Sequence, residues 1–313
     1  MDTKHILAWV KENNPKAYVE DRYDKTKQPA GDPDCKLGCK RRHNRRKTGS
    51  EPENLATPTK NPVPAKDRSA GEFYWGYGSG VIVIKAPGWG EFVLAELTQT
   101  FDKGDATYFF PLMAQVEQRL SAKPRFGTFD AAYDAWYVYA YFHRDDDPQA
   151  FAAVPFAEKG GYKAKDRQFS PEGLPMCQAG LPMPLKMTFT DRTRAIIQHE
   201  RGSYVCPLLF PQPDGRTCPK NHKNWPKGGC LVDMPTSIGA RLRCTLDRDS
   251  QAYKDIYKQR TATERINSQA KALDIERPYL RNGAAIANQN TLIYILINLR
   301  MLQRIRNRQM ETD

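Results

Sequence analysis

The sequence predicts an α/β protein in which helices flank a mixed sheet and a β-rich subdomain is inserted. Three observations predict this class. Two β-rich runs between residues 72 and 100 are joined by a tight turn, strand-like and helix-like runs alternate over 105–155, and residues 157–250 combine frequent Pro, Gly and Cys with short alternating runs. The predicted domains are therefore a core of residues 1–156 and 251–313 and an inserted β-rich subdomain of residues 157–250.

The N-terminal segment is expected to be mostly irregular. Residues 3–14 are interpreted as a short helix ended by Asn14-Pro15. Residues 20–70 are polar and rich in Pro, Lys and Arg, with almost no apolar periodicity, so a long basic loop is expected. A dense cationic cluster in this loop is either a phosphate-contacting segment or a solvated run of charge; its members are Lys40, Arg41, Arg42, Arg45 and Arg46.

A hairpin opens the ordered core. The β-rich runs Glu72–Lys85 and Glu91–Thr100 flank a Pro-Gly-Trp-Gly turn, which is typical of two antiparallel strands. Asp105 is then expected to cap a helix over 107–121, because apolar residues recur there at helical spacing.

Further alternation follows the first helix. A short buried strand is expected over Phe126–Asp130, an aromatic-rich helix over 132–143, and a second buried strand over 150–155. From residue 251 to about 308 the pattern is helical, with breaks at Pro278 and at Asn282-Gly283.

Composition favours a polyanionic partner. The 313 residues include 48 Lys and Arg against 36 Asp and Glu, which gives a net charge of +12 and a pI near 9.3. Such an excess favours nucleic acid as the partner, although a merely basic protein has the same balance. The N-terminus lacks the pattern of a secretory signal, and the most apolar run is too short for a bilayer, so no membrane association and a cytoplasmic location (nucleoid-associated in a bacterium) are expected.

One segment near the C-terminus places four polar side chains in line. Tyr257, Arg260, Glu264 and Lys271 are separated by steps of three, four and seven residues. On an α-helix these steps bring the four side chains within roughly 60° of one another, while the opposite face is apolar. A carboxylate can hold a metal ion and the flanking cations can hold phosphate oxygens, so the pattern suggests chemistry on a phosphate backbone.

A second carboxylate follows a predicted strand. Asp130 ends the run Phe126-Gly-Thr-Phe-Asp and thus stands at a sheet edge, where α/β proteins build their sites. The alternative is an aspartate that caps the next helix, which is common for this residue type.

Taken together, these segments resemble the insertion-sequence group of DDE transposases. The spacing Tyr257-x2-Arg260-x3-Glu264-x6-Lys271 resembles the Y-R-E-K motif of that group. The segment from Phe129 to Asp134 resembles its second-Asp motif, the segment from Asp2 to Ala8 resembles its first-Asp motif, and Gly76-Tyr77-Gly78 matches a Gly-Tyr strand of the group.

The resemblance implies a ribonuclease-H-like fold and a transposase that cleaves DNA and transfers strands. Its metal-binding catalytic residues would be Asp2, Asp130 and Glu264, which would hold two Mg²⁺ ions for in-line displacement at phosphorus. Tyr257, Arg260 and Lys271 would contact DNA phosphates near the scissile bond. The implied partners are double-stranded DNA, as element ends and as target, and a second copy in a homodimeric synaptic complex.

The first-Asp motif departs from the family pattern. In the family an apolar strand leads into this aspartate and a DNA-binding region precedes it, whereas here Asp2 follows Met1 directly. A truncated, catalytically inactive DNA-binding remnant that competes with a full-length transposase is therefore the alternative function. A metal-dependent nuclease of the same fold that lacks strand transfer is a further alternative.

Seven cysteines without a secretory signal favour reduced thiols or metal ligation over a disulfide framework. Three thiols and an imidazole within a short stretch could complete a tetrahedral zinc site, although their spacing matches no recognised finger. These candidate Zn²⁺ ligands are Cys206, Cys218, His222 and Cys230. A looser cluster is formed by Cys35, Cys39 and His43.

Overall fold

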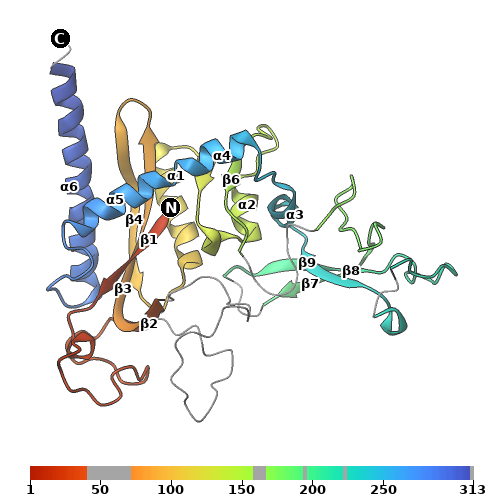
Figure 1. The fold of residues 1–313 in the computed structure, drawn as a ribbon, viewed down its shortest axis with the longest axis horizontal. Coiled ribbons are helices and arrows are strands. Elements are labelled where there is room, and N and C mark those ends of the chain that lie inside the picture. Colours follow the sequence, from red (N-terminus) through yellow and green to blue (C-terminus); the bar gives the residue numbers. More distant parts are fainter. Residues whose placement is uncertain (41–71, 158–166, 193–195, 221–223, 311–313) are drawn as a thin grey trace, which may run out of the picture. The chain divides into compact units, whose positions relative to one another are not determined.

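The computed structural model describes residues 1–40, 72–157, 167–192, 196–220 and 224–310 of a mixed α/β protein (Figure 1). The chain forms two compact units. The terminal unit comprises residues 2–119 and 261–313, and the central unit comprises Met1 and residues 120–260. The predicted insertion at 157–250 lies within the central unit, and its status as a separate subdomain stays a prediction.

The sheet of the terminal unit is built on one long hairpin. Strand β3 (Glu72–Ala86) pairs antiparallel with β4 (Gly90–Thr100), which confirms the predicted hairpin. The connecting turn uses Gly88 and Gly90, whose φ angles are 78° and 148°. Strand β2 (Lys36–Lys40) pairs antiparallel with the first residues of β3, and β1 (Asp2–Leu7) pairs antiparallel with the next stretch, from Gly76 to Val81, so that β3 lies between β1 and β2.

The N-terminal segment is a strand, and the predicted helix over residues 3–14 is wrong. After β1 only the short 3-10 helix η1 (Lys11–Asn13) is helical. The reason is visible in the burial, because Ile6, Ala8 and Val10 are all buried and alternate with more exposed residues. This period of two is typical of an extended chain that packs one face against a core.

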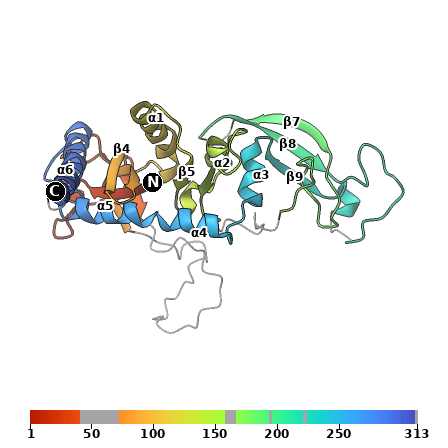
Figure 2. The same ribbon diagram turned by 90° about the horizontal axis from the view of Figure 1, so that it is seen from above.

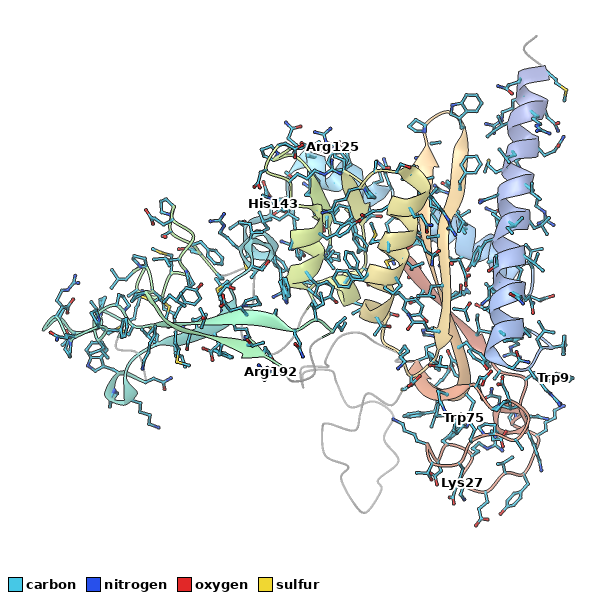
Figure 3. All side chains as sticks on the ribbon, turned by 180° about the vertical axis from the view of Figure 1, so that it is seen from behind. Trp9, Lys27, Trp75, Arg125, His143 and Arg192 are labelled. Carbon is cyan, nitrogen blue, oxygen red and sulfur yellow. The ribbon has the colours of Figure 1, made fainter. Side chains whose placement is uncertain are left out.

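The loop expected over residues 20–70 also contains an ordered strand, β2. Cys35 and Leu37 are buried at its start. Trp75 of β3 anchors the irregular segment before it, because its indole Nε1 donates to the Arg22 carbonyl over 2.7 Å and its backbone pairs with the Asn13 side chain. Figure 3 labels Trp75 beside the segment that carries Lys27.

Helices cover both faces of this sheet. The helices α5 (Thr261–Lys271) and α6 (Gly283–Met310) contribute buried side chains to one core, where Ile266 and Ile293 meet Trp75 and Val81. The 3-10 helix η2 (Asp105–Tyr108) and α1 (Phe109–Leu120) lie on the opposite side of the sheet (Figure 2).

Glycines of β3 permit the close approach of η2. The Tyr108 hydroxyl donates to the Gly78 carbonyl over 2.9 Å. A Cβ atom at Gly78 would lie 2.6 Å from the Tyr108 hydroxyl, and one at Gly80 would lie 2.4 Å from the Tyr108 ring. Only a residue without a side chain therefore fits at these two positions of the sheet.

The continuous helix predicted through residues 257–271 is wrong. The helix α4 (Gln251–Lys258) ends before a turn at 259–260, and α5 begins at Thr261. The backbone N–H groups of Gln259 and Arg260 donate to Ile256 and Tyr257, three residues back, instead of extending the four-residue ladder. Neither Gly nor Pro occurs in this stretch, so no residue type signals the break.

The central unit contains a parallel strand pair covered by helices. Strand β5 (Phe126–Thr128) pairs with β6 (Phe151–Ala153), and α4 packs on both. The short helix α2 (Trp136–Phe142) packs against α3 (Ile238–Thr245) at Gly239, where an added Cβ would lie 2.0 Å from the Trp136 carbonyl.

A separate antiparallel sheet completes the central unit. Its order is β7 (Leu185–Asp191), β8 (His199–Val205) and β9 (Leu231–Pro235). Its buried core is small; its members are Met183, Tyr204, Met234 and Ala240. The short strands expected around 185 and 203 are thus present, whereas β9 and α3 were not predicted. Across the described ranges, no helix has both the length and the apolar character needed to cross a bilayer.

Candidate carboxylate site

Asp2 is held at the start of β1 by neutral donors. It pairs with Val81 of β3 and is half-buried. Its Oδ1 atom accepts the backbone N–H of Thr3 over 3.0 Å, and its Oδ2 atom accepts Asn267 Nδ2 over 3.0 Å. Among the described residues no cation forms an ion pair with Asp2, so lone pairs of this carboxylate stay available to a ligand.

The contact with Asn267 joins Asp2 to the helix that carries Glu264. Both Asn267 and Glu264 belong to α5 and are three residues apart, so they are neighbours on one face of this helix. Glu264 is exposed, whereas Ala262 and Ile266 are buried, as the sequence predicted for the opposite face. Two of the three predicted metal ligands therefore belong to elements of the terminal unit that this hydrogen bond joins.

Asn267 is a site residue that the sequence reasoning missed. Its side chain is buried at 7% exposure, and its Oδ1 atom has no hydrogen-bond partner within the described part of the chain. A buried amide oxygen without a partner is costly, and such atoms are often explained by an unseen water or ion. The signal in the sequence was a polar residue, Asn267, one helical turn after Glu264 and next to the apolar face of the helix.

Further polar groups surround Asp2. The Thr3 hydroxyl donates to Asp105 Oδ1 over 2.6 Å, and the predicted capping role of Asp105 is wrong because Gly104 occupies the N-cap of η2. Burial lowers the pKa of His5, whereas the charges of Asp105 and Asp2 act in the opposite direction. The two carboxylates therefore give this edge of the sheet local negative charge.

Asp130 belongs to the central unit. It lies just beyond β5 and caps the 3-10 helix η3 (Ala131–Tyr133), where its side chain accepts the N–H of Ala132 over 2.9 Å. The capping alternative raised from the sequence is thus present in the structure. Asp130 is half-buried, and its role as a metal ligand stays a prediction.

Asp134, the second aspartate of the same motif, is a structural residue. Its side chain has no exposed surface and forms a bidentate pair with Arg243, at 2.8 and 2.6 Å. The Tyr139 hydroxyl and the N–H of Ala157 each donate to it over 2.9 Å. Every lone pair that geometry allows is occupied, so this carboxylate ties α2 to α3.

The predicted phosphate contacts are divided between the two units. Tyr257 and Arg260 lie at the end of the central unit, where the Tyr257 ring stacks on Tyr253 with centroids 5.7 Å apart. Lys271 ends α5 in the terminal unit, and its ammonium lies 3.6 Å from a Glu276 oxygen. The exposed Lys271 side chain would have to exchange this weak pair for a phosphate.

The predicted cationic cluster is only partly within the described residues. Lys40 is the exposed last residue of β2. Arg41, Arg42, Arg45 and Arg46 lie outside the residues that the structure describes. Their role in contacting phosphate stays a prediction.

The cysteines do not assemble a metal site in the described ranges. Cys206 is buried, Cys218 and Cys230 are half-buried, and His222 lies outside the description. No group of three or more His, Cys, Asp or Glu side chains suited to a metal ion occurs in the part of the chain that is described. The zinc site stays a prediction.

A hollow of about 640 Å³ lies within the central unit between α3, α4 and β6. Its lining includes Phe126, His143, Phe151, Leu246 and Ile256, of which His143 is labelled in Figure 3. No predicted site residue lines it, so cavity and predicted chemistry do not coincide.

Comparison of the chain with protein-family models, with curated proteins and with solved structures finds no match.

Proposed function

We propose that this chain is a DNA strand-transfer enzyme of the DDE transposase kind, built on a ribonuclease-H-like core. The observation that carries the proposal is the Asn267–Asp2 hydrogen bond of 3.0 Å. It brings the first-Asp motif of β1 to the helix that carries Glu264, although about 260 residues separate the two in sequence. Two short motifs that matched the family by chance would not be expected to lie on elements joined by a hydrogen bond.

The donor set fits magnesium. Asp2 and Glu264 offer carboxylate oxygens, and Asn267, which donates to Asp2 through Nδ2, carries a buried Oδ1 atom without a hydrogen-bond partner among the described residues. Hard oxygen ligands of this kind suit Mg²⁺ better than zinc or copper. When bound, two such ions supply activation of an attacking oxygen and stabilisation of a leaving oxygen.

The proposed reaction has two steps with defined protein roles. Water attacks a phosphodiester at the element end, and the freed 3′-hydroxyl then attacks target DNA. Asp2, Asp130 and Glu264 would hold the ions, while Asn267 fixes the orientation of Asp2. Tyr257, Arg260 and Lys271 would bind phosphates and so align the scissile bond, since a guanidinium matches phosphate geometry in a bidentate manner.

The variant Glu264→Gln tests the proposal. It keeps the size of an exposed side chain on α5, so the free energy of unfolding should change by less than about 0.5 kcal/mol. Mg²⁺-dependent cleavage of a duplex that carries the element ends should fall by roughly 10³-fold or more, whereas DNA affinity should stay within about twofold. Glu172→Gln, at another exposed glutamate, is the matched control. Cleavage retained in Glu264→Gln would contradict the proposal.

DNA binding is tested separately through salt. If six or more phosphates are contacted, affinity for duplex DNA should fall by roughly 10³-fold between 50 and 200 mM salt. An affinity for duplex DNA that does not change with salt would contradict binding through the net positive charge. Salt-dependent binding by the unaltered chain without any Mg²⁺-dependent cleavage would instead favour the inactive DNA-binding remnant.

A further inference from the structure

Two cysteines of the central unit face each other across a strand pair. Strands β8 and β9 pair antiparallel as far as Val205 and Leu231. The next position in the same register joins Cys206, directly after β8, to Cys230, directly before β9. Opposite residues of antiparallel strands have Cβ atoms about 4.5–5.5 Å apart, only slightly beyond the roughly 3.5–4.5 Å that a disulfide needs.

The turn before Cys230 is pressed against Cys206. A Cβ atom added at Gly229 would lie 2.6 Å from Cys206 Cβ and 3.0 Å from Cys206 Sγ. Gly228 and Gly229 both adopt positive φ angles, 93° and 81°, which a residue with a side chain rarely adopts. Two consecutive glycines thus bring the backbone next to Cys230 into direct contact with the other thiol.

The thiols also contact each other in the reduced state. The side chains of Cys206 and Cys230 are joined by a hydrogen bond. Burial, together with the neighbouring Cys206 and Cys177, raises the pKa of Cys230 to about 12. Cys230 therefore reacts slowly at neutral pH, but the contact keeps the two sulfur atoms next to each other.

We propose that Cys206 and Cys230 are a redox modification site, which a small-molecule disulfide of the glutathione type converts into an intramolecular disulfide. The thiolate of one cysteine attacks the small disulfide and releases one small thiol. The second cysteine then attacks the mixed disulfide and releases the other small thiol, so the protein loses two hydrogens and the reagent gains them. The bond closes the loop of residues 207–229.

This pair suits a disulfide better than a zinc ion. A structural zinc site needs four ligands, and the described residues contain no group of three. The neighbouring sheet has a buried core of only four residues, so a covalent link between the ends of β8 and β9 would restrict the unfolded chain where apolar burial contributes little.

The experiment uses the full chain, reduced and then exposed to oxidised glutathione at pH 8.5, where more thiolate is present. Peptide mapping by mass spectrometry should find the Cys206 and Cys230 peptides joined and lacking two hydrogens. The midpoint of thermal unfolding of the central unit should rise by roughly 5–10 °C and return after reduction. Cys230→Ser, at a half-buried position, should abolish both effects, and Cys206→Ala should do the same.

Substitutions of two other cysteines serve as controls. Cys39→Ser, an exposed thiol of the terminal unit, and Cys177→Ser should leave the link intact. A link that uses Cys177 in place of either cysteine would overturn the proposal. So would an equivalent of zinc that copurifies with the chain and is lost in Cys230→Ser, or a pair still fully reduced after prolonged oxidation at pH 8.5.

Discussion

Asp134 in the central unit and Asp2 in the terminal unit are both anchored carboxylates, but their partners differ in charge. Asp134 is fully buried and is matched by the guanidinium of Arg243, by the Tyr139 hydroxyl and by a backbone N–H. Asp2 is half-buried and, within the described ranges, is held by one backbone N–H and the Asn267 amide.

The charge of the partners distinguishes a carboxylate that stabilises the fold from one that can bind a ligand. A buried carboxylate whose charge is neutralised and whose lone pairs are filled contributes to cohesion and has nothing left to bind. A carboxylate oriented by neutral donors keeps its charge and spare lone pairs, as a metal ligand must. Asp130 and Asp134 are four residues apart in one motif, yet Asp134 is paired with a guanidinium, whereas Asp130 caps η3 through a backbone N–H and its role as a metal ligand stays a prediction.

The largest expected effect is at the structural carboxylate. Asp134→Ala should lower the free energy of unfolding by about 3–5 kcal/mol, because the half-buried Arg243 would lose its counter-charge and the buried Tyr139 hydroxyl its acceptor. Chemical denaturation of the purified chain measures this. The double variant Asp134→Ala with Arg243→Met should recover part of the loss, since no unpaired charge then remains. A loss of stability below about 1 kcal/mol for the single variant would contradict the structural role of Asp134.

A smaller effect is expected at the residue that orients Asp2. Asn267→Ala should slow Mg²⁺-dependent cleavage by roughly 10–100-fold, which is the range for partners that orient metal ligands. Stability should change by only about 1 kcal/mol, because the lost hydrogen bond is offset by removal of the unpartnered Oδ1 atom. Ser268→Ala, the exposed neighbour on α5, is the control. Equal cleavage by both variants would show that Asp2 does not need Asn267.

The smallest effect concerns a third carboxylate, Glu96 of β4, which accepts hydroxyl hydrogen bonds from Ser79, Thr98 and Thr291. Burial raises its pKa above the ordinary value of 4.5, although these hydrogen bonds act in the opposite direction. The folded state therefore binds the proton more tightly than the unfolded state. This stabilisation is present below pH 4.5 and is lost as pH rises through the folded pKa.

Glu96→Gln removes this titration. It should be more stable than the unaltered chain at pH 7, by less than about 1 kcal/mol, and the difference should vanish near pH 4. Urea denaturation between pH 4 and pH 8 measures both curves. Parallel curves would show that Glu96 is as well solvated in the folded state as in the unfolded one.

The hairpin at 72–100 and the buried face of α5 could be predicted because each rests on a repeated local pattern. The strand at 2–7 was mistaken for a helix because only three buried residues reveal its period of two. The break at 259–260 could not be predicted, since neither Gly nor Pro occurs there; it coincides with the boundary between the two units.

The site shows the same limit. Glu264 and Asp2 were predicted as metal ligands from motifs, and this stays a prediction, whereas Asn267 could not be singled out because its contact with Asp2 spans most of the chain. Cys230 was identified as a metal ligand, but its cross-strand register with Cys206 follows from β9, which no sequence pattern marked. Long-range pairing decides such assignments, and local spacing does not report it.

Gly78 and Gly80 on β3 affect the position of a charged residue that lies outside this strand. Because Gly78 and Gly80 admit the Tyr108 ring, η2 lies low on the sheet, and Asp105 at its start can reach Thr3, the neighbour of Asp2. A single methyl group at Gly80 would lift η2 and draw that second negative charge away. The absence of side chains at Gly78 and Gly80 therefore contributes to the negative electrostatic potential around Asp2.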